Sequence, residues 1–278
     1  FIDSEELTGN LCPIALEEAI VDSIQKGKKP KAIVAVHLYG MPYQVDEINA
    51  IANKYEIPIL EDSAESLGST YKGKHCGTFG TYGVLSFNGN KIITTSGGGA
   101  LVCPSKETKD KTVFLSTQAR DNAPHYQHSE IGYNYRMSNV CAGIGRGQME
   151  VLQAHIELRR AMHKFYVELF SKYNFVKVLQ EPNEDYYCNF WLSAIVVNHP
   201  TKEKTREGLR LHLDKYNIES RPLWKPMHMQ PIFENAPFYG DNVAEKLFEN
   251  GLCLPSGSNL NDHDRNRIKT AIEEYLEN

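Results

Sequence analysis

The chain has 278 residues, with 30 Lys and Arg against 35 Asp and Glu, so its formal net charge is −5. This length suits about two domains with large cores, and the ordinary Gly and Pro content excludes collagen-like and disordered chains. The mildly acidic balance offers no basic face for nucleic acid. With no apolar run of about 18 residues and no signal-peptide pattern, we expect no membrane span and a cytoplasmic protein.

The six cysteines are scattered, so none forms the close pairs that hold zinc. Most stand among apolar residues, which is typical of small core side chains in a reducing compartment. We therefore expect neither disulfides nor a metal site.

The first half of the chain predicts alternating strands and helices. Apolar, β-rich residues 32–39 predict a strand, residues 45–55 a helix with an apolar stripe, and residues 57–60 a short buried strand. Strand, helix and strand within about 30 residues predict a right-handed βαβ unit with parallel strands. The same layered plan includes a helix at 13–26, strands at 84–87 and 99–103, and a helix at 107–118.

The second half has a different pattern. A long amphipathic stretch covers residues 137–172 and is followed by shorter elements. These are a strand at 190–197, a helix at 205–216, a short strand into Arg221-Pro222, a loop rich in Pro, Met and aromatic residues, and a closing helix at 262–276. We therefore predict a large domain at 1–140, then a connecting helix and a smaller α/β domain at 141–278.

Two motifs resemble binding sites without the context that such sites need. Residues 68–75 spell G-x-x-x-x-G-K, but His75 stands where a phosphate loop has Ser or Thr, and no helix follows. A charged β-turn is the better interpretation. His125 and His128 lie in a polar segment with no third ligand nearby, so a loop is favoured over a zinc site there.

Asp62 and Lys91 are the main candidates for chemistry. Asp62 ends a buried strand, and open α/β sheets bind ligands outside the carboxyl ends of their strands. Lys91 leaves the next strand through an Asn/Gly turn, close to Ser86. The alternatives are a helix N-cap or turn carboxylate for Asp62 and a solvated surface cation for Lys91.

Together these residues suggest pyridoxal phosphate (PLP). That cofactor needs a lysine for its Schiff base, an acid for its pyridine nitrogen, and hydroxyl or N–H groups for its phosphate. The 29-residue spacing allows neighbouring strands to present Asp62 and Lys91 at one opening.

Five motifs in order resemble the DegT/DnrJ/StrS family of PLP-dependent nucleotide-sugar aminotransferases. They are Glu61-Asp-Ser-Ala-Glu65, Gly77-Thr-Phe-Gly80, Ser86-Phe-Asn-Gly-Asn-Lys91, Gly97-Gly-Gly-Ala100 and Gly132-Tyr-Asn-Tyr-Arg136. The resemblance implies a homodimer of fold type I, the aspartate aminotransferase type.

The same resemblance implies a role for each matching residue. Lys91 would bind PLP and shuttle the proton, and Asp62 would pair with the pyridinium. Glu65 would lie near the phenolic oxygen, Ser86 would hold the phosphate, and Asn134 would reach the phosphate from the partner subunit.

Residues 221–231 are similar to the loop of family members that act on UDP-linked 4-keto-6-deoxy sugars, of the bacillosamine type. Arg221, Lys225 and His228 would then contact the diphosphate or the sugar. The alternative is a packing loop with Trp224 and Met227 in the core.

The expected activity is transfer of an amino group, with glutamate as donor, to the C4 ketone of a nucleotide sugar. The rivals are a PLP-dependent sugar dehydratase, against which Lys91 argues, and a non-catalytic regulator. The family's N-terminal region, with a phosphate turn and an aromatic residue that stacks on the ring, has no counterpart before Phe1. We therefore expect an N-terminally incomplete large domain.

Overall fold

The computed structural model describes residues 1–201 and 203–277. Its first sheet has the order β1-β2-β5-β6, and β1, β2 and β5 run parallel while β6 is antiparallel to β5. The strands are β1 (Ile33–Val36), β2 (Ile59–Asp62), β5 (Tyr82–Ser86) and β6 (Gly99–Val102). Helix α2 (Val45–Lys54) connects β1 to β2, which confirms the predicted βαβ unit.

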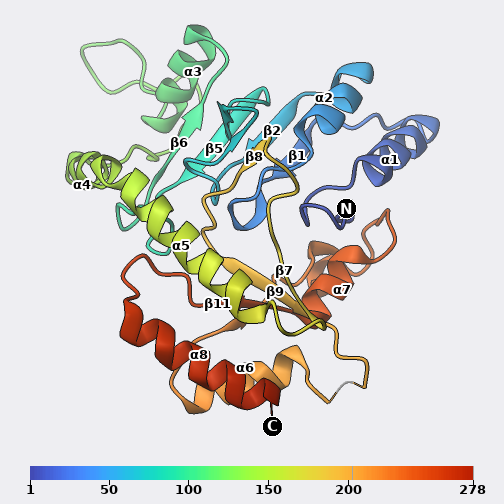
Figure 1. Ribbon diagram of the computed structural model, residues 1–278. Helices are drawn as coiled ribbons and strands as arrows, with labels where there is room; N and C mark the ends of the chain where they lie inside the picture. Colours follow the sequence, from blue (N-terminus) through green and yellow to red (C-terminus); the bar gives the residue numbers. More distant parts are fainter. Residues whose placement is uncertain (202, 278) are drawn as a thin grey trace.

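The two faces of this sheet differ in cover. One face packs on α1 (Pro13–Gln25) and α2, with Leu16, Ile20 and Ile48 among the buried residues of that core. The opposite face is open in part, since the side chain of Val34 on β1 is 56% exposed. Figure 1 shows both helices lying beside the blue strands of this sheet.

The second sheet is antiparallel, with the order β10-β11-β9-β7. Its strands are β7 (Val176–Val178), β9 (Ser193–Val197), β10 (Arg221–Pro222) and β11 (Gly251–Leu254). Helices α5 (Leu152–Phe170), α6 (Arg206–Lys215) and α8 (Asp262–Glu277) supply the rest of its core, as Figure 1 shows. The mostly parallel first sheet and the smaller antiparallel second sheet agree with the α/β class that the sequence predicts.

A small third sheet joins the two halves of the chain. Strands β3 (Thr70–Tyr71) and β4 (Lys74–His75) form a hairpin, and β8 (Tyr186–Tyr187) pairs with β3. The turn residues Lys72 and Gly73 both have positive φ, 49° and 74°, as a two-residue hairpin turn requires. The motif that resembles a phosphate loop is therefore the predicted β-turn.

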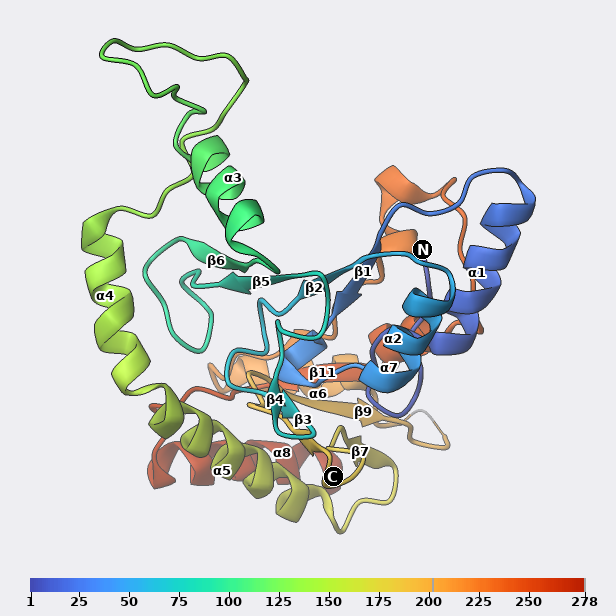
Figure 2. The same ribbon diagram turned by 90° about the horizontal axis from the view of Figure 1, so that it is seen from above.

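The stretch 137–172 is two helices rather than one. Helix α4 (Asn139–Glu150) begins at Ser138, whose hydroxyl caps it, and α5 follows after a break at Val151 with φ −107° and ψ 2°. Before them, α3 (Lys106–Ser116) leads into residues 117–138, which extend away from the rest of the chain in Figure 2.

Several predicted boundaries were wrong. The strand expected at 190–197 begins only at Ser193, and the strand expected at 57–60 runs from Ile59 to Asp62. Helix α7 (Val243–Asn250) and β11 were missed. The strand expected at 32–39 ends at Val36, and the 3-10 turn η1 (Leu38–Gly40) takes its last residues. The 3-10 turns η2 (Met227–Met229) and η3 (Pro231–Phe233) fall where a loop was expected. The domain limits 1–140 and 141–278 stay a prediction.

Among the described residues, no helix is long and apolar enough to cross a membrane. The six cysteines are free; Cys76, Cys188 and Cys253 are buried, whereas Cys12, Cys103 and Cys141 are only partly so.

Candidate active site

Lys91 lies between a carboxylate and an aromatic ring. Its Nζ is 3.6 Å from Oε1 of Glu65 and 4.4 Å from the centroid of the Trp191 ring. The side chains of Lys91 and Glu65 are each only 13% exposed. Lys91 is thus not the solvated surface cation that the sequence left open.

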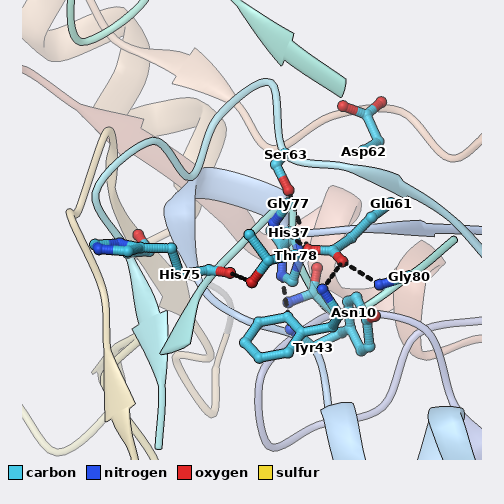
Figure 3. Close-up of polar contacts among 12 residues, drawn as sticks. Asn10, His37, Tyr43, Glu61, Asp62, Ser63, His75, Gly77, Thr78 and Gly80 are labelled. Carbon is cyan, nitrogen blue, oxygen red and sulfur yellow. Dashed lines mark hydrogen bonds and ion pairs between the residues drawn. The ribbon is translucent and has the colours of Figure 1, made fainter. Parts of the chain in front are cut away.

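Asp62 faces the open side of the first sheet, and so does Ser86. Successive side chains on a strand point to opposite faces, so Asp62 points away from Glu61, as Figure 3 shows. Asp62 pairs in register with Val84, and Ser86 lies two residues further along β5 on the same face. The strand ends therefore present a carboxylate and a hydroxyl toward one region.

Glu65 is close enough to both Asp62 and Lys91 for their charges to affect its pKa. Burial raises the pKa of Glu65, and the nearby charge of Asp62 raises it further, whereas the Tyr39 amide and the charge of Lys91 lower it. Oε2 of Glu65 accepts a hydrogen bond of 2.7 Å from the Tyr39 amide. The carboxyl group of Glu65 therefore holds its proton more readily than an exposed one, within range of both Asp62 and Lys91.

Glu61 forms a buried network on the covered face that sequence reasoning missed. Its two oxygens accept hydrogen bonds from the amides of Gly77, Phe79 and Gly80, the last two at 2.7 Å, and Oε1 lies 3.0 Å from Nε2 of His37. Figure 3 shows these contacts converging on Glu61. The network fixes the segment Gly77–Gly80 against the end of β2, which makes it an anchor for the strand that carries Asp62.

A row of three aromatic rings leads away from Lys91, and sequence reasoning named only Trp224 among them. Trp191 lies under its amine, Trp224 is 6.4 Å from Trp191 between ring centroids, and Tyr39 is 5.6 Å from Trp224. The Tyr39 hydroxyl accepts a hydrogen bond from the Trp224 amide. These residues are distant in sequence, and no local motif marks Tyr39 or Trp191.

The three candidate substrate residues line neighbouring cavities, and Arg221 and Lys225 share one of about 920 Å³. Arg221 borders a cavity of about 680 Å³ together with Asn90 and Trp191, whereas Lys225 and His228 border another of about 610 Å³. Nε2 of His228 lies 3.0 Å from Glu245, and Arg221 pairs with Glu219.

Trp224 lines the cavities of about 680 Å³ and about 610 Å³. Trp224 and Met227 are exposed in part, so the alternative that buried them in a packing core is wrong.

Asn134 is not among the residues that contact Lys91. Its main chain bridges to Thr117, and its side chain is exposed. His128 bonds to the Gln118 carbonyl and His125 to Gln127, and no group of three His, Cys, Asp or Glu side chains within residues 1–201 and 203–277 is placed to hold a metal ion.

The residues present fit PLP. A lysine amine lies beside the Glu65 carboxyl group, whose pKa burial raises, and an aspartate and a serine face the same open side of the sheet. An amine suits the aldehyde of PLP, a carboxylate suits its protonated ring nitrogen, and a hydroxyl suits its phosphate.

Comparison with known proteins gives a family match over nearly the whole chain. The model described as the DegT/DnrJ/EryC1/StrS aminotransferase family matches residues 1–273. The "Putative pyridoxal phosphate-dependent aminotransferase EpsN" of Bacillus subtilis (strain 168) is 46% identical over 272 residues, which cover 96% of this chain and 69% of EpsN.

Two further relatives agree with this match. The GDP-perosamine synthase of Escherichia coli O157:H7 is 35% identical, over 99% of this chain and 72% of that protein. The crystal structure of a DegT DnrJ EryC1 StrS aminotransferase from Brucella abortus superposes with a TM-score of 0.89 at 27% identity, over 99% of this chain and 72% of that one.

Proposed function

Because the chain belongs to the DegT/DnrJ/EryC1/StrS aminotransferase family, we propose that it moves an amino group from glutamate to the C4 ketone of a UDP-linked 4-keto-6-deoxy sugar. Enzymes of this family are PLP-dependent sugar aminotransferases. The product would serve the synthesis of a surface polysaccharide or another glycan in the cytoplasm. The choice of UDP rests on the resemblance of residues 221–231. GDP is the second nucleotide to test, because one relative is a GDP-perosamine synthase.

The observation that carries the proposal is the position of Lys91. Its amine is held beside Glu65, at the sheet edge where Asp62 and Ser86 face the same open side. An amine in this place can attack a carbonyl carbon, and after its release it can carry a proton between two neighbouring carbons.

PLP, when bound, supplies a reactive aldehyde and a ring that accepts an electron pair. Asp62 would hold the ring nitrogen in its protonated form through its opposite charge. Glu65 would lie near the phenolic oxygen, and Ser86 would bind the phosphate. Lys91 would hold the cofactor covalently and move the proton, and Asn134 of a second subunit would complete the phosphate site.

The substrate would reach Lys91 through the cavity of about 680 Å³. Asn90 and Trp191 border it next to Lys91, and Arg221 borders it as well. A guanidinium group binds phosphate oxygens through two hydrogen bonds, so Arg221 would contact the diphosphate. Lys225 and His228 would contact the substrate from the neighbouring cavity.

Replacing Lys91 tests the proposal directly. The chain is incubated with PLP, glutamate and a panel of UDP-, GDP- and dTDP-linked 4-keto-6-deoxy sugars, and products are identified by mass. Borohydride reduction followed by peptide mapping should place PLP on Lys91. Lys91→Ala should abolish both signals, whereas Lys106→Ala, at a highly exposed lysine, should keep them. Turnover by Lys91→Ala at the parent rate would refute the assignment.

A further inference from the structure

Trp191 makes two separate contacts with the turn that carries Lys91. Its ring face lies under the Lys91 amine, at 4.4 Å, and its indole N–H donates a hydrogen bond of 2.8 Å to the carbonyl of Asn90. The turn itself closes through the Lys91 amide, which donates to the Asn88 carbonyl at 3.0 Å. The Trp191 side chain thus contacts both the amine of Lys91 and the main chain directly before it.

Trp191 is itself fixed relative to Glu65. Its side chain is 3% exposed and packs with Ile92 and Ile156. Its amide donates to Oδ1 of Asn189, and Nδ2 of the same buried asparagine donates to the carbonyls of Glu65 and Leu67 at 2.9 and 3.0 Å. Asn189 therefore ties the main chain at Trp191 to the main chain at Glu65. The two residues that contact the Lys91 amine are thus held at a fixed separation.

We propose that Trp191 is a positioning residue for Lys91. Its ring attracts the ammonium group and its indole N–H orients the turn, so the amine is held beside Glu65 whenever it is free. This inference rests on the proposed function, in which Lys91 is the residue that binds PLP. Trp191 precedes β9, so the second sheet takes part in placing a side chain that the first sheet carries.

The reactivity of the free amine tests this role. The full chain, dialysed free of PLP, is treated with formaldehyde and cyanoborohydride, and methylation of Lys91 is measured by peptide mass against Lys106 on the same chain. Trp191→Leu should speed Lys91 methylation about tenfold, because a cation loses its contact with a buried ring and becomes more accessible. Trp191→Phe keeps a weaker ring and loses the N–H, so its increase should be smaller, about threefold.

Ile156→Ala is the matched control, because it loosens the same apolar cluster without touching Lys91. It should leave the Lys91 rate at the wild-type value. If Trp191→Leu and Trp191→Phe also keep the wild-type rate, or if Ile156→Ala raises it as much as they do, the positioning role is refuted. If Trp191→Leu does not fold by circular dichroism, the Trp191→Phe rate decides.

This result is separable from the proposed function. Should borohydride place PLP on another lysine while Trp191→Leu still raises Lys91 methylation, the assignment of Lys91 fails and the contact stands. Should PLP be found on Lys91 with unchanged methylation in both Trp191 variants, the positioning role alone fails.

Discussion

At the scale of single residues, the side chains of the neighbours Glu61 and Asp62 lie on opposite faces of the first sheet, because successive side chains on a strand alternate. Glu61 points into the covered core and Asp62 toward the open face. Burial alone would raise the pKa of Glu61, but His37 and the Gly80 and Gly77 amides outweigh it, and the net shift is downward. Glu61 is therefore a buried anion held by its donors, whereas the Asp62 carboxylate, which accepts from the Ala64 amide, faces the open side.

Asp62→Asn should reduce turnover about a hundredfold. An opposite charge at short range shifts a pKa by about 1–3 units, and without it the ring nitrogen of PLP loses its proton at neutral pH. The change is measured as kcat with glutamate, together with bound PLP by absorbance. Asp46→Asn, at a carboxylate paired with Lys72, should leave both unchanged; full activity of Asp62→Asn would contradict the role.

Because His37 is buried, the free energy of unfolding should fall in mild acid. Burial lowers its pKa from 6.5 despite Glu61, and its Nδ1 accepts from the Tyr43 amide, so the ring is neutral when folded. The unfolded chain binds a proton below about pH 6.5 before the folded one does. Stability should therefore fall as the pH drops below that value, by at most about 1.4 kcal/mol per pH unit for this group.

Urea unfolding at several pH values measures this dependence, and His37→Gln should reduce its slope. Some slope should remain, since burial also lowers the pKa of His163. Glu61, whose pKa is lowered, adds a second loss only as the pH falls below its usual 4.5. An unchanged slope between pH 5 and 7 in His37→Gln would contradict the neutral, buried state of His37.

At the scale of elements, the hairpin β3–β4 depends on Gly73. Its φ of 74° lies in the left-handed region, and a Cβ there would meet no atom within 4 Å. Gly73→Ala should therefore destabilise the protein by about 1–2 kcal/mol through backbone strain alone.

Thermal unfolding checks this value against Gly147→Ala in α4, where a Cβ also meets nothing and φ is not positive. That control should be neutral or stabilising by up to about 1 kcal/mol. Equal effects of the two changes would show that the turn conformation does not matter.

At the scale of the whole molecule, several large apolar side chains of the extended segment and of α4 are exposed. Ile131, Tyr135, Val140 and Ile144 are exposed, and Val140 and Ile144 lie one turn apart on the helix. Large contiguous apolar surfaces mark protein interfaces. They support the homodimer that we propose, in which Asn134 of this segment reaches the partner's site.

Val140→Asp with Ile144→Asp should convert the dimer to monomers, because the charges would be buried unpaired at the interface. Sedimentation velocity measures the shift. Ile14→Asp on α1 is the control, since Ile14 is 73% exposed, close to the 69% of Val140. A dimer that survives the double change places the interface elsewhere.

The sequence by itself determined the βαβ plan, the β-turn at 72–73 and the residue types that PLP requires. These follow from periodicity, Gly and Asn turn signals and short spacing, which act locally along the chain. The order of five short motifs was enough for the family.

Only the tertiary structure decided what surrounds Lys91. Trp191 lies 100 residues from Lys91 and reaches it because Asn189 bonds to the segment of Glu65. The elements α7 and β11 likewise pack against segments far apart in the chain, through Leu247 and Cys253 in one cluster with Tyr39 and Ala194. Contacts of this kind leave no period in the sequence, since each depends on where the rest of the chain has already folded.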